Sequence, residues 1–470
     1  MKVEQLFTSC LAEMAYYIES NGEAAIIDPL RETEPYLEMA KADGAKIKYV
    51  FLTHFHADFV SGQVDLAKKT GATIVFGPNA NPNYDIHKGI DGEEFKIGKV
   101  TLKLLHTPGH TMESSSYVLI DEKGNKPYVF TGDCLFIGDV GRPDLAVKSD
   151  VTEADLAGHL FDSLRNKIMT LPDDIVVYPN HGAGSACGKN MSTETFDTLG
   201  NQKKTNYALR ADMTKEEFIK EVTTGLMPPP QYFPNNVRMN KEINTSIDEI
   251  LHRGTTPIDA ATFKELSERD DILVIDTRSK DEYAEEGSVP GAWYIGVDGN
   301  FAPWVGSLIT NIKQKIIFIA EGGREHEVVT RFSRVGYDNT LGFLRGGIHA
   351  WLAAGFKVDK IGSISAMQFA KKLTEGNIVA LDVRKESEYL SEHVVGVENF
   401  PLDYIHSNFA EIKPDKEYFL HCASGYRSLI AASIFMANGV KNVTDVRGGF
   451  NDIKDTGVKL TDYVCPTTLL

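Results

Sequence analysis

The stretch that decides the fold is THFHADFVSG, residues 53–62 of the chain. It follows an apolar run at 49–52 that predicts a buried strand, and its last two residues open a predicted helix. His54, His56 and Asp58 therefore leave the end of one strand within five positions. Because imidazole and carboxylate groups crowded at a strand end are costly to hold without a cation, this spacing predicts a metal site rather than structural polar packing.

Composition and charge exclude several classes of protein. A net charge of −17 argues against a nucleic-acid surface, because phosphate binding needs clustered Lys and Arg. No run approaches the ~18 apolar residues of a membrane span, and the N-terminal residues lack the apolar core of a signal peptide. The five cysteines are few and widely spaced, which argues against a disulfide framework and suits a reducing cytoplasm. We therefore predict a cytoplasmic protein with no nucleic-acid or membrane partner.

Three later strands of the N-terminal half also end in a metal-ligating residue type. The predicted strands at 100–105, 128–130 and 175–178 lead to His110, Asp133 and His181. Ligands at strand ends can converge on one edge of a sheet sandwich, so we expect these side chains to meet the 53–62 stretch. The other predicted elements are strands at 15–18, 24–29 and 73–76 and helices at 34–42, 64–69 and 215–223.

The order of these motifs carries a family resemblance. THxHxD, then TPGHT at 107–111, TGD at 131–133 and a late histidine resemble the metallo-β-lactamase superfamily, which implies an αββα sandwich. Within that superfamily, GDVGRPD at 138–144 and HGAGSACG at 181–188 are similar to the persulfide dioxygenases. The glyoxalase II thioesterases match less closely. Membership of the superfamily does not by itself fix a reaction.

The resemblance to persulfide dioxygenases implies one Fe(II) per chain, held by His54, His110 and Asp133. Phe59 stands where the superfamily usually has a histidine that binds a second metal. Phenylalanine cannot bind a metal, so we expect a single ion. Two imidazoles and one carboxylate leave coordination positions open for O₂ and a sulfur substrate.

Two interpretations stay open for three further polar residues beside these ligands. His56, Asp58 and His181 are either partners that orient the ligands and pass protons, or polar packing near the site. A role for His56 as an extra ligand would favour hydrolysis.

Three residues are candidates for substrate contact. Arg142 is expected to anchor the carboxylates of glutathione or the phosphates of coenzyme A, unless it forms a structural ion pair with Asp144. Tyr178 is a candidate contact for the substrate thiol. Cys187, in a loop rich in glycine, is either reactive or inert.

The C-terminal half contains an internal repeat. VIDTR at 274–278 matches ALDVR at 380–384, 106 residues later. Each copy begins with a predicted helix, at 260–269 and at 366–375, and continues as alternating strands and helices. This alternation predicts a parallel sheet with helices on both faces in each copy.

The second copy carries HCASGYRS at 421–428, between a predicted strand and a helix at 428–437. The backbone N–H groups of such a loop and the helix N-terminus stabilise a thiolate or persulfide on Cys422, and Arg427 offers a cation to an anionic donor such as thiosulfate. With its DxR and RGG motifs, the copy resembles the rhodanese domain, a sulfurtransferase. The first copy has Glu321 in place of the cysteine, which predicts an inactive domain.

We therefore predict an α/β multidomain protein. Residues 1–245 form a metallo-β-lactamase-like αββα sandwich, 246–360 an inactive rhodanese-like domain and 361–470 a catalytic rhodanese domain, both with parallel sheets. The polar stretch 235–246, which lacks apolar periodicity, is the predicted domain boundary.

The resemblances together imply a coupled activity. A persulfide of glutathione, coenzyme A or another small thiol is oxidised by O₂ to sulfite, and Cys422 transfers sulfane sulfur to make or use thiosulfate, as in sulfide detoxification. We expect a homo-oligomer. Two alternatives stay open: a glyoxalase II-like thioester hydrolase with two metal ions, and a sulfur-responsive binding protein without turnover.

Overall fold

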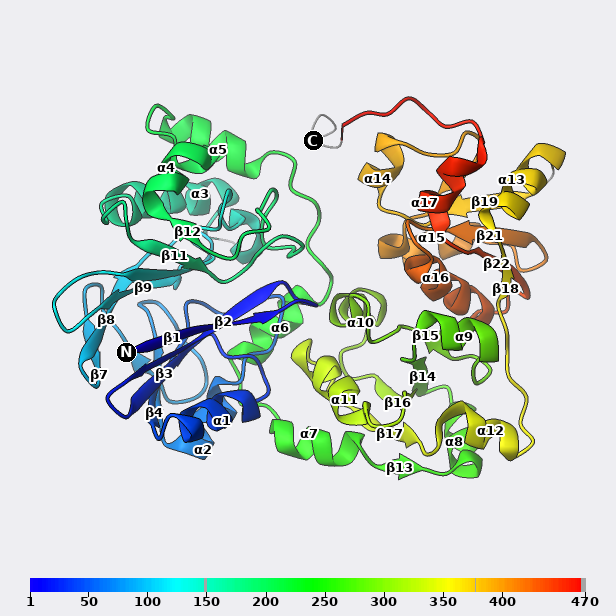
Figure 1. Cartoon of the computed structure of the whole chain (residues 1–470), viewed down its shortest axis with the longest axis horizontal. Helices are drawn as coiled ribbons and strands as arrows, with labels where there is room; N and C mark the ends of the chain where they lie inside the picture. The colour runs from blue at the N-terminus through cyan, green and yellow to red at the C-terminus, as the bar shows by residue number, and fades with distance from the viewer. Residues whose placement is uncertain (148–149, 377, 466–470) are drawn as a thin grey trace. The chain divides into compact units, whose positions relative to one another are not determined.

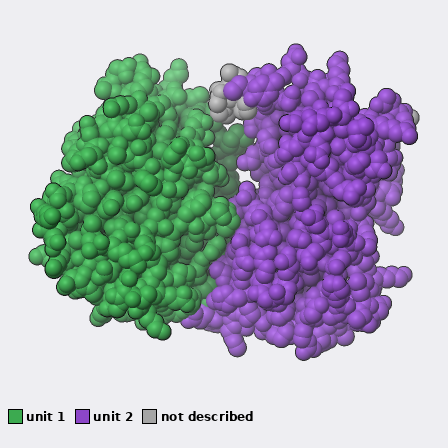
Figure 2. Space-filling model, in the orientation of Figure 1, with its two compact units in different colours: residues 1–247, 333–336 green, residues 248–332, 337–470 purple. Residues whose placement is uncertain are grey.

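The computed structural model describes residues 1–147, 150–376 and 378–465. The chain divides into two compact units, coloured separately in Figure 2. Unit 1 comprises Met1–Ile247 and Ser333–Gly336, and unit 2 comprises Asp248–Phe332 and Tyr337–Leu470. Both rhodanese-like copies lie in unit 2 as separate sheets. Among the described residues, no helix has the length and apolar character needed to cross a membrane.

Unit 1 is a sandwich of two six-stranded sheets (Figure 1). The first sheet has the order β1-β2-β3-β4-β5-β6, with antiparallel pairs up to β3 and parallel pairs from there on. Its strands are β1 (Lys2–Thr8), β2 (Glu13–Ser20), β3 (Glu23–Ile27), β4 (Lys46–Phe51), β5 (Thr73–Phe76) and β6 (His87–Lys88). The second sheet has the order β12-β11-β10-β9-β8-β7. Its strands are β7 (Glu94–Ile97), β8 (Val100–His106), β9 (Ser115–Ile120), β10 (Tyr128–Gly132), β11 (Val176–Pro179) and β12 (Asp197–Thr198).

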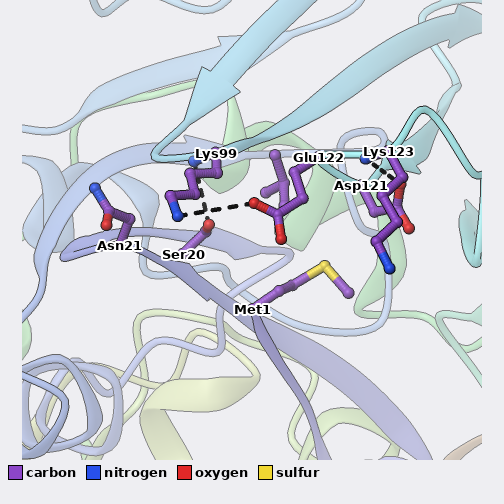
Figure 3. Close-up of a pocket in the computed structure, with 8 residues that line it drawn as sticks. Met1, Ser20, Asn21, Lys99, Asp121, Glu122 and Lys123 are labelled. Carbon is purple, nitrogen blue, oxygen red and sulfur yellow. Dashed lines mark hydrogen bonds and ion pairs between the residues drawn. The ribbon is translucent and has the colours of Figure 1, made fainter.

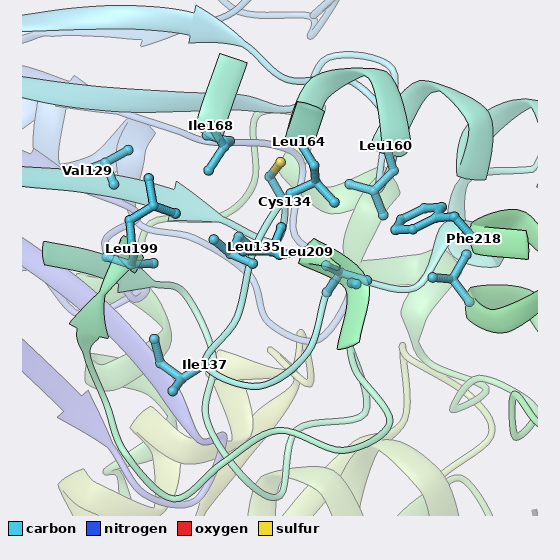
Figure 4. Close-up of a cluster of buried hydrophobic side chains, with 14 of the residues drawn as sticks. Val129, Cys134, Leu135, Ile137, Leu160, Leu164, Ile168, Leu199, Leu209 and Phe218 are labelled. Carbon is cyan, nitrogen blue, oxygen red and sulfur yellow. The ribbon is translucent and has the colours of Figure 1, made fainter. Parts of the chain in front are cut away.

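Three apolar layers hold this sandwich together. Along β2, Tyr16 faces the layer between the sheets, whereas Tyr17 faces the outer layer under α1 and α2. The third layer covers the second sheet, where Leu160 of α3 and Phe218 of α5 pack on the strands (Figure 4). These helices are α1 (Glu34–Ala42), α2 (Gln63–Thr70), α3 (Glu153–Ser163), α4 (Leu199–Thr205) and α5 (Lys215–Thr223). The predicted αββα sandwich is confirmed.

The two copies in unit 2 are both five-stranded parallel sheets with the same strand order, as the repeat predicts. The first has the order β13-β17-β16-β14-β15 and the second β18-β22-β21-β19-β20. The strands of the first are β13 (Pro257–Ile258), β14 (Ile272–Asp276), β15 (Trp293–Tyr294), β16 (Lys315–Ile319) and β17 (Thr340–Leu344). Those of the second are β18 (Gly362–Ile364), β19 (Val379–Asp382), β20 (Glu398–Asn399), β21 (Glu417–His421) and β22 (Asn442–Val446).

Helices lie between these strands in sequence. In and before the first copy they are α7 (Ile247–Gly254), α8 (Ala260–Ser267), α9 (Lys280–Glu286), α10 (Phe301–Leu308), α11 (Glu325–Arg334) and α12 (Gly347–Ala353). In the second copy they are α13 (Ala366–Glu375), α14 (Glu386–Ser391), α15 (Ile405–Asn408), α16 (Tyr426–Ala437) and α17 (Gly449–Ile453).

The predicted boundary stretch 235–246 begins inside a helix. Residues 235–240 belong to helix α6 (Phe233–Asn240), which has proline in its first turn and buries Met239 within unit 1. Its last residue, Asn240, is 2% exposed; its amide donates to the carbonyl oxygens of His56 and Phe59, both at 2.8 Å, and accepts from the backbone N–H of Ser61 at 2.8 Å. A side chain distant in sequence thus fixes the backbone of the 53–62 stretch. Sequence periodicity misses it because the helix is short and two of its four buried residues, Asn236 and Asn240, are polar.

A depression of about 390 Å³ lies on unit 1, away from these motifs (Figure 3). Lys99 and Glu122 form a loose ion pair across it at 3.8 Å, and both side chains are exposed. Its lining residues are Met1, Ser20, Asn21, Lys99, Val100, Asp121, Glu122 and Lys123. None of them belongs to the motifs singled out in the sequence.

Replacing Asn240 tests its structural role. In Asn240→Ala, two carbonyl oxygens and one N–H of the 53–62 backbone lose buried partners, so we expect unit 1 to lose at least about 2 kcal/mol of its free energy of unfolding. Urea denaturation measures this loss. Asn235→Ala, at a half-buried position of the same helix, is the control and should stay within about 0.5 kcal/mol of the parent. Equal stability of the two variants would contradict the assignment.

Candidate metal centre and thiol site

The ends of three strands bring His54, His110 and Asp133 together, as the motif order predicts. Asp133 Oδ2 lies 3.4 Å from His110 Nε2 and 3.9 Å from His54 Nε2. All three side chains are buried, and one potential ligand atom of each lies within 4.8 Å of the others. The three form a group of the size that one metal ion requires.

Hydrogen bonds at the far side of each ring set the tautomers of the two histidines. Thr53 Oγ1 donates its only proton to Asp28 at 2.8 Å, so His54 Nδ1–H must be the donor in the 3.0 Å contact with Thr53. The backbone carbonyl of Arg142 can only accept, so His110 Nδ1–H donates to it at 2.9 Å. Both Nε2 atoms are therefore left with free lone pairs that face Asp133, the arrangement in which histidine binds metals.

His56, Asp58 and His181 form a second buried group beside the first, again with ligand atoms within 4.8 Å of one another. His181 Nε2 lies 3.5 Å from Asp58 and 3.6 Å from Asp133 Oδ1, so it connects the two groups. His56 Nε2 contacts Asp28 at 3.0 Å. Burial lowers the pKa of His56, but the Asp28 carboxylate outweighs burial and raises it overall. His56 is thus held as a partner of a carboxylate.

Phe59, which the resemblance predicts to stand where the superfamily has a histidine ligand, is a fully buried ring. It stacks on His56 with ring centroids 4.3 Å apart. This end of the second group is therefore closed by an apolar ring that cannot bind a metal.

The donor atoms fit a cation. In the described part of the chain, both carboxylate oxygens of Asp58 and Asp133 and both ring nitrogens of His181 lack a hydrogen-bond partner although they are buried. Unpartnered buried carboxylates are costly, and a cation between them removes that cost. Burial also lowers the pKa of His54 well below its usual value, helped by the neighbouring His56, so its imidazole is neutral and free to bind.

Two acidic residues of this region belong to none of the motifs identified in the sequence. Asp28 is fully buried, and besides accepting from His56 it accepts from Thr53 N and Oγ1, each at 2.8 Å. Glu13 is fully buried, and neither of its oxygens has a hydrogen-bond partner among the described residues. Burial, and then the charge of Asp58, raises the pKa of Glu13 well above its usual value, so this carboxyl is held neutral. Asp28 lies near the end of the predicted strand 24–29, where the chain enters a polar turn, and this is the one signal that pointed to it.

The guanidinium of Arg142 is engaged within the protein. It forms a bidentate pair with Asp144 at 2.7 and 2.6 Å and donates to the carbonyls of Ala186 and Met227 at 3.2 and 2.5 Å. With its own carbonyl on His110, Arg142 therefore braces three loops and orients a metal ligand.

Cys187 and Tyr178 lie close to these groups in sequence but differ in their surroundings. Cys187 Sγ lies within 4.8 Å of ligand atoms of Asp133 and His181. Burial, and then the charges of Asp58 and Asp133, raises the pKa of Cys187 well above its usual value, which keeps it a thiol. Tyr178 stacks on Phe130 in the layer between the sheets, with centroids 5.7 Å apart.

The loop around Cys422 forms a second candidate site, in unit 2. Gly425 N–H donates to Cys422 Sγ at 3.1 Å and Ser428 Oγ–H donates to it at 3.6 Å. Gly425 has a φ of 96°, which favours glycine, and it caps helix α16, whose N-terminus follows. Arg427 makes two hydrogen bonds to Glu388 at 2.5 and 2.9 Å, so its charge is paired in this structure.

The prediction that Glu321 stands at the position of Cys422 is wrong by one residue. Ile319 pairs with Asp276 as His421 pairs with Asp382, so Ala320 is the residue of the first copy that corresponds to Cys422. Glu321 accepts from the backbone N–H of Ser279 at 3.2 Å and lies 3.6 Å from Arg324. The two copies also meet beside Cys422: Tyr426 Oη donates to the carbonyl of Gly296 at 2.8 Å, and its ring covers Gly299 so closely that a Cβ there would lie 2.2 Å from it.

Comparison with known proteins assigns the first half. The family model described as "Metallo-beta-lactamase superfamily" matches residues 9–181. The mitochondrial persulfide dioxygenase ETHE1 of Mus musculus is 31% identical over 222 residues, which are 46% of this chain and 79% of that protein. The chain belongs to the metallo-beta-lactamase superfamily. A second model, "Rhodanese-like domain", matches residues 259–354 and 365–456, so two rhodanese-like domains follow the superfamily domain.

Two further proteins are similar to this chain. The probable hydroxyacylglutathione hydrolase glo2 of Schizosaccharomyces pombe is 32% identical over 198 residues, covering 41% of this chain and 72% of that protein. A crystal structure titled as a metallo-beta-lactamase from Staphylococcus aureus is 30% identical with a TM-score of 0.63, covering 73% of this chain and 98% of that one. The relatives thus include both an oxygenase and a hydrolase, and the superfamily alone does not choose between them.

Replacing Asp133 tests the metal centre, because the change is expected to stabilise the metal-free protein and to weaken metal binding. Asp133→Asn removes a buried carboxylate without a hydrogen-bond partner, so we expect the metal-free protein to be more stable by about 1–3 kcal/mol. The same variant should lose the rise in melting temperature that Fe(II) gives the parent under anaerobic conditions. Asp174→Asn, at an exposed position, is the control. A metal-dependent rise retained in Asp133→Asn would show that the carboxylate is no ligand.

Proposed function

We propose that the chain is a persulfide dioxygenase joined to a sulfurtransferase. At the first site, a small-thiol persulfide reacts with O₂ and water to give the thiol and sulfite: RSSH + O₂ + H₂O → RSH + H₂SO₃. The observation that carries the proposal is the group His54, His110 and Asp133, with Phe59 in place of the superfamily's further ligand. Two histidines and one carboxylate with open positions are typical of non-haem Fe(II) oxygenases.

The chain's own residues have defined tasks in this mechanism. His54, His110 and Asp133 would hold one Fe(II), which supplies the redox chemistry with O₂ when bound. Thr53 and the Arg142 carbonyl keep both imidazoles in the ligand tautomer. All these side chains are nearly inaccessible, so bulk water is kept from the reacting sulfur.

Asp58 and His181 lie beside the ligands, 3.5 Å from each other, and are available to take up the protons that sulfite formation releases.

The second site would move sulfane sulfur. The thiolate of Cys422 attacks the outer sulfur of a persulfide RSSH; a new S–S bond forms at Cys422, the donor's S–S bond breaks, and the donor leaves as RSH with the persulfide proton. Attack by sulfite on the Cys422 persulfide then releases thiosulfate. The N–H of Gly425 and the N-terminus of α16 stabilise the sulfur anion in both states. Glutathione or coenzyme A persulfide as substrate, a cytoplasmic location and a homo-oligomer complete the proposal.

A second candidate function is thioester hydrolysis. The group His56, Asp58 and His181 offers ligand atoms for a second cation, and a hydroxyacylglutathione hydrolase is among the relatives. The two candidates differ in metal content, because the hydrolase needs two ions per chain and the dioxygenase one.

Oxygen uptake tests the proposed function. With Fe(II)-loaded protein, we expect glutathione persulfide to cause O₂ consumption and sulfite release, with one iron per chain by elemental analysis. His110→Ala should abolish O₂ uptake, whereas His159→Ala, at an exposed position, and Cys422→Ser should leave it unchanged. Two metal ions per chain with hydrolysis of a glutathione thioester would favour the second candidate. Absence of both turnovers would leave a binding protein.

The Arg427–Glu388 pair predicts how Glu388 affects a thiosulfate donor. Burial raises the pKa of Glu388, but the hydrogen bonds and charge of Arg427 outweigh it and lower the pKa, so Glu388 is ionised and competes with an anion for Arg427. Glu388→Gln should therefore lower KM for thiosulfate in cyanide-dependent sulfur transfer by roughly threefold to tenfold. Glu386→Gln, exposed on the same helix, is the matched control. A raised KM in Glu388→Gln would contradict this competition.

A further inference from the structure

A lysine of the first rhodanese-like copy lies at the Cys422 loop of the second copy. Lys280 Nζ donates to the backbone carbonyl of Ser424, two residues after Cys422, at 3.4 Å. Both Lys280 and Ser424 are exposed, so the ammonium group is open to solvent beside the loop. Lys280 belongs to none of the motifs identified in the sequence, and the proposed function gives it no role.

Buried contacts between the two copies fix the position of this lysine relative to the loop. The backbone N–H of Tyr294, on β15, donates to Ser433 Oγ of α16 at 2.9 Å. His406 Nε2–H donates to the carbonyl of Leu308 at 2.6 Å, because a carbonyl can only accept. Helix α9, which begins at Lys280, connects β14 to β15, and α16 begins at the end of the Cys422 loop. The segment that carries the lysine is therefore held against the helix that follows the cysteine.

The stability of its own helix does not explain Lys280. It is the first residue of α9, where the partial positive charge of a helix N-terminus makes a cation unfavourable. The next two residues, Asp281 and Glu282, are acidic, as that charge favours. In the second copy the residue 106 positions later is Glu386, the first residue of α14. The copy without the cysteine thus has the lysine that reaches the Cys422 loop, and the copy with the cysteine has the carboxylate that a helix start favours.

A negatively charged sulfur donor needs a cation at this loop. When the Cys422 thiolate attacks the outer sulfur of thiosulfate, a new S–S bond forms at Cys422. The bond between the two sulfurs of thiosulfate breaks, and sulfite leaves with its electron pair. An anion thus approaches a dianion, and a cation beside the loop lowers their repulsion.

Lys280 is the cation at the loop whose charge is not already paired. Arg427 makes two hydrogen bonds to Glu388, and Arg324 lies 3.6 Å from Glu321. Lys280 has no ion-pair partner in the described part of the chain, and its one contact is with a neutral carbonyl. A hydrogen bond to an anion is stronger than one to a neutral carbonyl, so the flexible lysine side chain would exchange Ser424 for an anionic ligand.

We propose that Lys280 is a specificity-determining residue of the Cys422 site. Supplied by the first copy, its ammonium group binds the oxyanion group of the sulfur donor, such as the SO₃ group of thiosulfate or a carboxylate of glutathione persulfide. This deepens the proposed sulfurtransferase function and rests on it for its role in turnover. The copy without a cysteine then contributes a side chain to the site of the other copy.

Two alkylating reagents that differ in charge test the proposal without sulfur transfer or metal. In the full chain, iodoacetate and iodoacetamide react with the same thiolate. The ratio of their rates, measured on the Cys422 peptide by mass spectrometry, therefore reports the charge at the site and not the thiolate fraction. Lys280→Met should lower the iodoacetate-to-iodoacetamide ratio about fivefold at low ionic strength. The difference should shrink at about 1 M salt.

Matched variants separate charge from structure. Lys280→Arg should keep the parent ratio. Lys313→Met removes the same charge at an exposed position of the same copy. Lys313 precedes β16, which runs parallel to β14, so it lies at the opposite edge of the sheet from the start of α9, and the ratio should match the parent. Equal ratios in Lys280→Met and Lys313→Met would overturn the proposal, and so would a loss in Lys280→Arg as large as that in Lys280→Met.

Cyanide-dependent sulfur transfer separates this inference from the proposed function. In Lys280→Met, KM for thiosulfate should rise about fivefold with little change in kcat, because a cation beside the loop binds the donor before and during the reaction alike. If the parent transfers no sulfur but Lys280→Met lowers the alkylation ratio, the proposed sulfurtransferase function is refuted and the anion-binding role stands. If the parent transfers sulfur and Lys280→Met leaves both KM and the ratio unchanged, this inference alone is refuted.

Discussion

The carboxylate of Asp28 is the interaction on which the first site depends. It accepts from the backbone and hydroxyl of Thr53 and contacts His56, so one buried charge fixes the start of the 53–62 stretch. Asp28 has a φ of 49°, an uncommon conformation for a residue with a Cβ, which turns the chain after β3. Through Thr53, the same carboxylate determines which nitrogen of His54 is free. Asn240 fixes the far end of the stretch, so both flanks are held by partners distant in sequence.

Much of the fold could be predicted because it follows from local patterns. Alternating apolar residues gave the strands of the sandwich, and the repeat gave two sheets of equal order. The convergence of His54, His110 and Asp133 was also predictable, since each lies within four residues of the end of a strand and strand ends share an edge.

The residues that escaped prediction are polar side chains whose roles come only from packing. Asp28 and Asn240 look like ordinary turn and helix residues, and only their burial against the 53–62 stretch reveals what they hold. Helix α6 was missed for the same reason, because its buried face includes Asn236 and Asn240. Arg142 is the opposite case, because it was predicted to have a role that its contacts do not support. The residue type suggests an anion anchor, whereas the structure commits its guanidinium to Asp144 and two loop carbonyls.

The contact of Tyr426 with the first rhodanese-like copy has a consequence for dissecting the protein. The residue stands between Gly425 and Arg427, so the hydrogen bond to Gly296 and the fit over Gly299 anchor the Cys422 loop to a domain outside its own sheet. A truncated fragment limited to the last hundred or so residues would contain the whole Cys422 loop. It would lack the contacts of Tyr426 with Gly296 and Gly299. The first copy thus supports the Cys422 loop, and reconstitution would have to begin from both copies together.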